Sequence, residues 1–141
     1  MTTLYPYLVF EGRCEEAIEF YKLALGAKVE MLLRFSDAPD PPPPEMVPPG
    51  NGHKVMHSEL RIGDSVMMAT DGSCGGRGEF RGFSIAVDAP DEPTLNRWFA
   101  ALSDGGQVTM PLGPTFWSPR FGMLTDRFGV GWMLGVQPPA A

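Results

Sequence analysis

Residues 115–136 of this 141-residue chain read TFWSPRFGMLTDRFGVGWMLGV, and this stretch decides the fold. Two β-patterned runs flank residues 126–129 (DRFG), which have the composition of a tight turn. The turn leads directly into an apolar strand with Trp132, Met133 and Leu134. We therefore predict a hairpin that lines a pocket, and its last strand is the place to look for a metal ligand.

The N-terminal third of the chain alternates between strand and helix patterns. Residues 14–25 predict an amphipathic helix, because their apolar side chains recur at helical spacing and Gly26 follows as a C-terminal cap. Residues 4–10 predict a strand before this helix, and residues 28–35 predict a strand after it. In the second strand we expect one apolar face, made of Val29, Met31, Leu33 and Phe35, with Leu32 as the exception.

A β-hairpin is predicted after a proline-rich loop. Residues 36–53 contain seven prolines, which exclude a helix or a central strand and predict an extended loop. Residues 54–62 and 65–70 are β-patterned, and Gly63 and Asp64 between them suit a two-residue turn. The turn predicts a register in which Ile62 faces Ser65, Arg61 faces Val66, Glu59 faces Met68 and His57 faces Thr70.

The same order of elements begins again after a glycine-rich connector. Residues 82–88 predict a strand. A helix is predicted to start near Asp91, with Pro93 in its first turn, and to stop at Gly105 and Gly106.

The two halves therefore match in pattern. Residues 26–29 and 105–108 occupy the same place in each half. We predict an α+β fold of two βαβββ modules: residues 1–72, which include the proline loop 36–53, and residues 79–137. Together these modules are expected to form one structural domain.

The composition is that of an ordinary globular protein, with 43% hydrophobic and 20% charged residues. The net charge is −6 and no basic run is present, so we expect no binding to nucleic acid. The first residues show no signal-peptide pattern, and no apolar run approaches the roughly 18 residues of a membrane span, so we expect a cytoplasmic protein without membrane contact. Cys14 and Cys74 are predicted to be free thiols.

Three segments carry a resemblance to a known family: EEAIEFYKLALGAKV (15–29), KVMHSELRIGDSVMMATD (54–71) and TFWSPRFGMLTDRFGVGWM (115–133). With these segments the chain resembles the vicinal oxygen chelate superfamily (glyoxalase, bleomycin resistance and dioxygenase proteins), and in particular its PhnB-like branch. The resemblance covers nearly the whole chain. It implies curved mixed sheets around a cleft, helices on the outside, and a homodimer.

Metal-using members of that superfamily take His or Glu ligands from the first and last strand of each module. In this chain the corresponding positions fall on Pro6, Met68, Gly82 or Phe83, and Met133. None of these side chains is a ligand for a hard divalent metal, and a thioether suits softer ions. We therefore expect no metal and no other cofactor.

His57 and Glu59 are the candidate catalytic residues. They lie two residues apart on one predicted strand, so both project from the face that also carries Met68. An imidazole titrates near neutral pH, so His57 can act as a general base or orient a ligand, and Glu59 can raise its basicity. The alternative is a strand histidine that is hydrogen-bonded for structure only.

Other side chains are predicted to bind the ligand, namely Leu8, Phe10, Met68, Trp117, Arg120 and Met133. Trp117 and Arg120 can hold a planar or anionic ligand by stacking and bidentate hydrogen bonds, or they can be core and ion-pair residues instead. We predict a protein that binds a small molecule in a metal-free pocket. The alternative is a lyase, isomerase or phosphonate-related enzyme, with His57 as acid/base and the proline loop as a lid.

Overall fold

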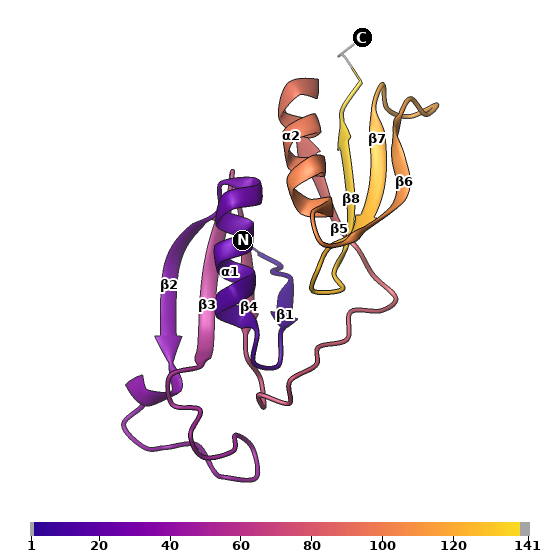
Figure 1. Ribbon diagram of the computed structural model, residues 1–141. Helices are drawn as coiled ribbons and strands as arrows, with labels where there is room; N and C mark the ends of the chain where they lie inside the picture. The colour runs from indigo at the N-terminus through magenta and orange to yellow at the C-terminus, as the bar shows by residue number, and fades with distance from the viewer. Residues whose placement is uncertain (1, 139–141) are drawn as a thin grey trace. The chain divides into compact units, whose positions relative to one another are not determined.

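The computed structural model describes residues 2–138, and the chain divides after Gly78 into two compact units. Within the described residues each unit has one α-helix and four strands, in the order β-α-β-β-β (Figure 1). In each unit the first strand pairs in parallel with the last strand, and the other pairs are antiparallel. The predicted α+β fold of two βαβββ modules is confirmed.

The first unit forms a sheet in the strand order β1-β4-β3-β2 (Figure 1). Its elements are β1 (Tyr7–Val9), α1 (Cys14–Leu25), β2 (Lys28–Arg34), the 3₁₀ turn η1 (Phe35–Asp37), β3 (Val55–Ile62) and β4 (Ser65–Thr70). The strand β1 is shorter than the predicted 4–10, because only its last part pairs with β4.

Helix α1 covers one face of this sheet (Figure 1). The six residues predicted for its apolar stripe are the ones it buries. They pack over a strand face that carries Leu8, Leu60, Met67 and Ala69, each at most 3% exposed. The opposite side of the sheet is called the open face below, and its side chains include Tyr7, Val9, Met31, Leu33, His57, Glu59 and Met68.

The predicted hairpin register is confirmed at the positions nearest the turn. Ile62 lies opposite Ser65, and Glu59 lies opposite Met68. Gly63 has a φ of 60°, and it is the one central residue of the turn with a positive φ. This conformation is that of a type II′ turn, which explains the glycine at its first central position.

A β-bulge changes the face prediction for β2. Val29 pairs with Leu60 and Met31 pairs with Glu59, so Glu30 is an extra residue on this strand. An extra residue shifts all later side chains to the other face. The predicted single apolar face is therefore wrong: Val29 lies on the helix side of the sheet, and Met31 lies on the open face.

The second unit forms a sheet in the order β5-β8-β7-β6 (Figure 1). Its elements are β5 (Ile85–Ala89), α2 (Glu92–Ser103), β6 (Gln107–Gly113), β7 (Phe121–Thr125) and β8 (Gly131–Val136). Helix α2 begins where predicted, because the Asp91 side chain accepts a hydrogen bond from the Thr94 amide at 2.8 Å. None of the helices in the described part of the chain is long and apolar enough to cross a membrane.

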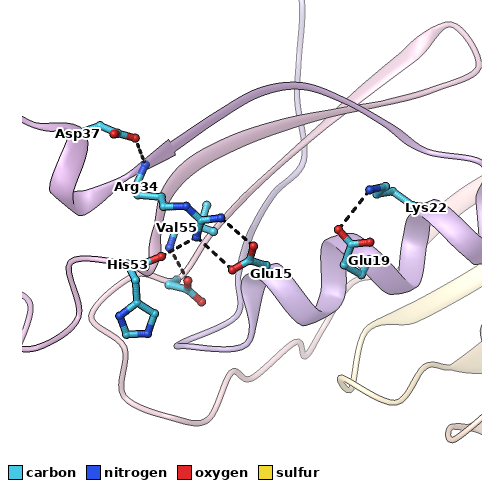
Figure 2. A network of polar contacts seen from close by, with 8 residues as sticks. Glu15, Glu19, Lys22, Arg34, Asp37, His53 and Val55 are labelled. Atoms are coloured by element: carbon cyan, nitrogen blue, oxygen red, sulfur yellow. Dashed lines mark hydrogen bonds and ion pairs between the residues drawn. The ribbon is translucent and has the colours of Figure 1, made fainter.

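The proline-rich segment between β2 and β3 is a loop whose base is closed by hydrogen bonds. The Phe35 amide donates to the Lys54 carbonyl at 3.1 Å, and the Ser36 amide donates to the Gly52 carbonyl at 2.9 Å. Figure 2 shows Arg34 beside this base, where its guanidinium contacts the Glu15 carboxylate and the His53 carbonyl. The loop is therefore anchored at both ends, and one anchor is the first turn of α1.

One buried carboxylate in each unit holds the strand ends in place. In the first unit, Asp71 is fully buried and accepts hydrogen bonds from the amides of Gly12, Cys14 and Val55, at 2.9, 2.7 and 2.7 Å. Asp71 thereby ties the start of α1 to the start of β3. A carboxylate is suited to this position because it only accepts hydrogen bonds and it lies at the positive end of the helix dipole.

In the second unit, Asp126 has the corresponding role in the turn before β8. It accepts hydrogen bonds from the amides of Phe128 and Val130 and from the indole nitrogen of Trp132, at 2.9, 3.0 and 2.9 Å. The turn at residues 126–129 is therefore organised around the side chain of its first residue, Asp126.

The substitution Asp71→Asn is expected to destabilise the protein by about 2–4 kcal/mol, because the new amide group presents a donor to backbone donors that are buried. Urea unfolding followed by circular dichroism measures this free energy. The matched control is Asp64→Asn in the exposed hairpin turn, which should change the free energy by less than about 0.5 kcal/mol. Equal stability of the two variants would contradict the role of Asp71.

Candidate functional site

Three polar side chains form a continuous hydrogen-bond chain on the open face of the first unit. The Tyr7 hydroxyl lies 2.8 Å from His57 Nδ1. On the other side of the ring, His57 Nε2 lies 3.2 Å from Glu59 Oε2. The chain Tyr7–His57–Glu59 thus connects two neighbours on β3 with a residue of β1 that is 50 positions away from His57.

The Glu59 carboxylate at the end of this hydrogen-bond chain fixes the direction of both hydrogen bonds. An ionised Glu59 only accepts, so the hydrogen on the ring belongs on Nε2. The unprotonated Nδ1 of a neutral His57 then accepts a hydrogen bond from the Tyr7 hydroxyl. In this arrangement a proton that the Tyr7 oxygen takes from a bound molecule can pass on to His57, and Glu59 can stabilise the imidazolium that results.

Partial exposure leaves this chain accessible from one side. The side chains of His57 and Glu59 are 23% and 27% exposed, and the whole of Tyr7 is 49% exposed. Burial raises the pKa of the Tyr7 phenol, and a hydrogen bond with the Thr70 side chain opposes this effect. Tyr7 therefore stays neutral, as a hydrogen-bond donor, throughout the physiological pH range.

Apolar side chains surround the polar chain on the same face. Leu33 pairs with His57, and Met31 pairs with Glu59, across the β2–β3 ladder. Met68 lies opposite both Tyr7 and Glu59. Exposed apolar groups around a few convergent polar groups are the usual composition of a small-molecule site.

Tyr7 was not among the residues that the sequence singled out. Strand alternation could have found it, because Leu8 and Phe10 share one face of β1 and Tyr7 and Val9 share the other. Leu8 and Phe10, which were predicted to bind the ligand, are 1% and 2% exposed on the helix side of the sheet. These two residues belong to the core of the first unit, and the β1 side chains exposed on the open face are those of Tyr7 and Val9.

The predicted ligand-binding residues of the second unit each have a different contact. Trp117 is 48% exposed and stacks edge-on against Phe121, with ring centroids 5.3 Å apart. The Arg120 guanidinium donates to the Asn96 side chain of α2 at 2.8 Å. Met133 pairs with Met123 in the middle of the sheet.

The pairing register shows which residues of the two units correspond. Tyr7 lies opposite Met68 in the first unit, and Ala86 lies opposite Met133 in the second. Pro6, which the sequence placed at the first ligand position, precedes β1, and its carbonyl accepts a hydrogen bond from the Met68 amide. Tyr7 on β1 and Ala86 on β5 are therefore the residues that lie beside Met68 and Met133.

These four positions do not fit a hard divalent metal. They offer one phenol, two thioethers and one methyl group, whereas such ions prefer carboxylate, imidazole or carbonyl ligands. Among residues 2–138 there is also no group of three or more His, Cys, Asp or Glu side chains that could hold a metal ion. The expectation of a metal-free protein stays a prediction.

The two thiols do not add a nucleophile to the site. Both Cys14 and Cys74 are free in the structure. Burial raises the pKa of the Cys14 thiol to about 12, and the nearby Asp71 adds to this effect. Cys14 is fully buried at the start of α1, so it behaves as a core residue.

Two cavities adjoin the proline loop. They have volumes of about 610 and 620 Å³, and both include Phe35 and Val47 in their walls. The second cavity also reaches Met56 of β3 and Thr70 of β4. Met56 directly precedes His57, so this cavity begins beside the hydrogen-bond chain.

The chain belongs to a known protein family. The family model of the Glyoxalase/Bleomycin resistance protein/Dioxygenase superfamily matches residues 3–134. The resemblance inferred from the sequence is therefore confirmed, and the two βαβββ units are the modules of this family.

Individual relatives agree with this membership. Protein YjdN from Escherichia coli is 34% identical over 138 residues, which cover 94% of each chain. The solved structure of protein PA1353 from Pseudomonas aeruginosa is 39% identical, with a TM-score of 0.83 over 97% of this chain and 98% of that chain. A PhnB protein from Bacillus cereus is 26% identical, with a TM-score of 0.76 over 96% of this chain and 99% of that chain.

The Tyr7 phenol is expected to titrate above the ordinary tyrosine pKa of about 10. Because the folded state holds this proton more tightly, Tyr7 contributes stability that is fully present below about pH 10 and is lost as the pH rises through the folded-state pKa. Tyrosinate absorbance of wild type minus that of Tyr7→Phe measures the midpoint. A midpoint at or below the ordinary tyrosine value of about 10 would contradict the expected direction.

Proposed function

We propose that the open face of the first unit binds a small molecule without a metal ion. The observation that carries this proposal is the hydrogen-bond chain Tyr7–His57–Glu59, which is partly exposed and lies among exposed apolar side chains. Both ring nitrogens of His57 are engaged, and their partners are themselves partly exposed, so a bound molecule can reach the ends of the hydrogen-bond chain.

The geometry favours recognition of a ligand that has both a polar and an apolar part. The Tyr7 hydroxyl donates its one hydrogen to His57, so the two ends of the hydrogen-bond chain, the Tyr7 oxygen and the Glu59 carboxylate, both offer acceptors to a ligand. The apolar surroundings, Met31, Leu33 and Met68, offer dispersion contacts with little directional demand. Trp117, Arg120 and Met133 stay predicted ligand contacts of the second unit.

The second candidate function is acid/base catalysis at the same residues. One observation favours it: a phenol, an imidazole and a carboxylate are bonded in series, which is the arrangement that moves a proton and stabilises the resulting imidazolium. In this function His57 receives a proton from a bound substrate, directly or through the Tyr7 hydroxyl, as in an isomerase, a lyase or a phosphonate-related enzyme.

One experiment separates these functions. Wild type and His57→Gln are screened by thermal shift against small carboxylates, phosphonates, carbonyl compounds and aromatic antibiotics, and every compound that binds is analysed by mass spectrometry after incubation. We expect His57→Gln to weaken binding about tenfold, the equivalent of one hydrogen bond. Loss of turnover with binding retained would instead favour the enzyme.

The chain provides its own control for this screen. His53 is the other histidine, and it is exposed and outside the hydrogen-bond chain. His53→Gln should bind every compound as wild type does, since the group that Arg34 contacts is the His53 backbone carbonyl. Identical ligand shifts in the two variants would refute the role of His57.

We further propose that the chain assembles into a homodimer. Support comes from the outer edge strands, where Val29 on β2 and Val108 on β6 are 39% and 42% exposed. Exposed apolar residues on an edge strand favour association, and natural monomers usually protect such edges with charges.

Light scattering at micromolar concentration is expected to give about twice the chain mass of 15.4 kDa. Val108→Lys should shift the protein towards the monomer, because a charge is costly to bury in an interface. Leu23→Lys, on the exposed side of α1, is the control and should leave the mass unchanged. A monomeric wild type would refute the dimer.

A further inference from the structure

The loop between β2 and β3 is an organised structure that encloses an apolar space. Its base is held by Arg34, whose guanidinium lies 2.7 Å from the Glu15 carboxylate and 2.6 Å from the His53 carbonyl (Figure 2). The amide of Arg34 also donates to the Asp37 carboxylate at 2.7 Å. Fixed ends lower the entropy that the loop would lose on binding a ligand.

The loop turns back on itself to make a wall. The amides of Met46 and Val47 both donate to the Pro43 carbonyl, at 2.9 and 3.0 Å. Val47 and Phe35 are each 8% exposed, so their side chains point into the loop and not into solvent. Prolines supply much of the remaining wall, and their rigid rings keep its shape.

The sheet supplies the opposite wall of the 620 Å³ cavity through an irregularity of β3. Leu33 pairs with His57 and Arg34 pairs with Val55, so Met56 is an extra residue at this point of the strand. Such a bulge re-aims the side chain of the extra residue. Met56 thereby lines the cavity, next to the residue that carries the imidazole.

Thr70 is the second link between the cavity and the hydrogen-bond chain. It lines the cavity and follows Met68 by two positions on β4, so it lies on the open face with Tyr7. Its hydroxyl donates to the Met56 carbonyl at 2.6 Å, which fixes the bulge. The cavity and the polar chain are therefore two parts of one surface of the first unit.

The walls of the cavity restrict the chemistry of its occupant. Among the described residues that line it, Asp40 is the one with a charged side chain, so an anion would be repelled and no basic group would compensate. The volume of about 620 Å³ lies in the range of ligand sites, which is roughly 300–1,000 Å³. Rigid proline rings and flexible thioethers pack well against aromatic and branched apolar groups.

We propose that this cavity binds the apolar body of the ligand whose polar group contacts Tyr7 and His57, and that the ligand is a neutral or cationic molecule with an aromatic or branched apolar body. This inference rests on the proposed function, since it assigns the ligand class of the same site. The proline loop is then a fixed wall of the binding site.

The probe for this inference is the neutral dye N-phenyl-1-naphthylamine, whose fluorescence rises in an apolar site. We expect wild type to bind it at least about tenfold more tightly than 8-anilinonaphthalene-1-sulfonate, which shares the aromatic body and adds a negative charge. Met56→Glu should weaken binding of the neutral dye at least about tenfold, because it places a charge in the apolar wall. Leu23→Glu, on the exposed side of α1, is the matched control and should bind as wild type does.

A second variant guards against a folding defect. Met46 lines the same cavity but is 61% exposed. Met46→Glu should therefore weaken binding of the neutral dye without lowering the midpoint of thermal unfolding. The inference is overturned if wild type does not bind the neutral dye, if it prefers the sulfonate, or if Met46→Glu and Met56→Glu both bind as the control does.

The outcome is distinguishable from a failure of the proposed function. Compounds that depend on His57 but bind Met56→Glu as tightly as wild type would overturn the cavity and leave the function of the open face intact. Dye binding that depends on Met56, with no compound that distinguishes His57→Gln from His53→Gln, would support the cavity and refute the polar part of the site.

Discussion

The buried carboxylate of Asp71 is the constraint on which the first unit depends. It accepts hydrogen bonds from Gly12, Cys14 and Val55, and these three amides belong to the start of α1 and the start of β3. Asp71 directly follows β4, so it fixes both starts to the end of that strand. Because Val55 is held in this way, the bulge at the next residue, Met56, is fixed in place as well. His57 directly follows this bulge. The position of its imidazole therefore depends on the hydrogen bonds of Asp71 to the starts of α1 and β3, and not on the hydrogen bonds of the candidate site itself.

The two units show how one architecture carries different side chains. Register places Glu59 of the first unit where the second has Met123, because Met31 pairs with Glu59 and Met110 pairs with Met123. Tyr7 similarly corresponds to Ala86. The open face of the first unit thus has hydrogen-bonding groups where the corresponding positions of the second have methyl and thioether groups, and a duplicated fold has divided polar and apolar roles between its halves.

Local features of the sequence predicted the local structure well. The stripe of α1 and the Gly63 turn depend on spacing and turn chemistry within a few residues, and both are as predicted. The parallel pairing of Tyr7 with Met68 joins segments 61 positions apart, and bulges at Glu30 and Met56 appear only when two strands are paired. For that reason the sequence placed His57 and Glu59 on one face but did not show that Tyr7 is hydrogen-bonded to His57. The burial of Leu8 and Phe10 is a local feature, because strand alternation places them on the face opposite to Tyr7.

The charges around the hydrogen-bond chain bear on the choice between binding and catalysis. An enzyme that removes a proton next to a carbonyl must stabilise the negative charge that develops on the substrate. On β3 the cation that shares the face of His57 and Glu59 is Arg61, and its guanidinium is bonded to Glu30. The neutral Tyr7 hydroxyl already donates its one hydrogen to His57, and Glu59 adds negative charge to the hydrogen-bond chain. This arrangement is better suited to holding a neutral or cationic ligand than to stabilising an anion, which is why binding takes precedence over catalysis in the function proposed for this fold.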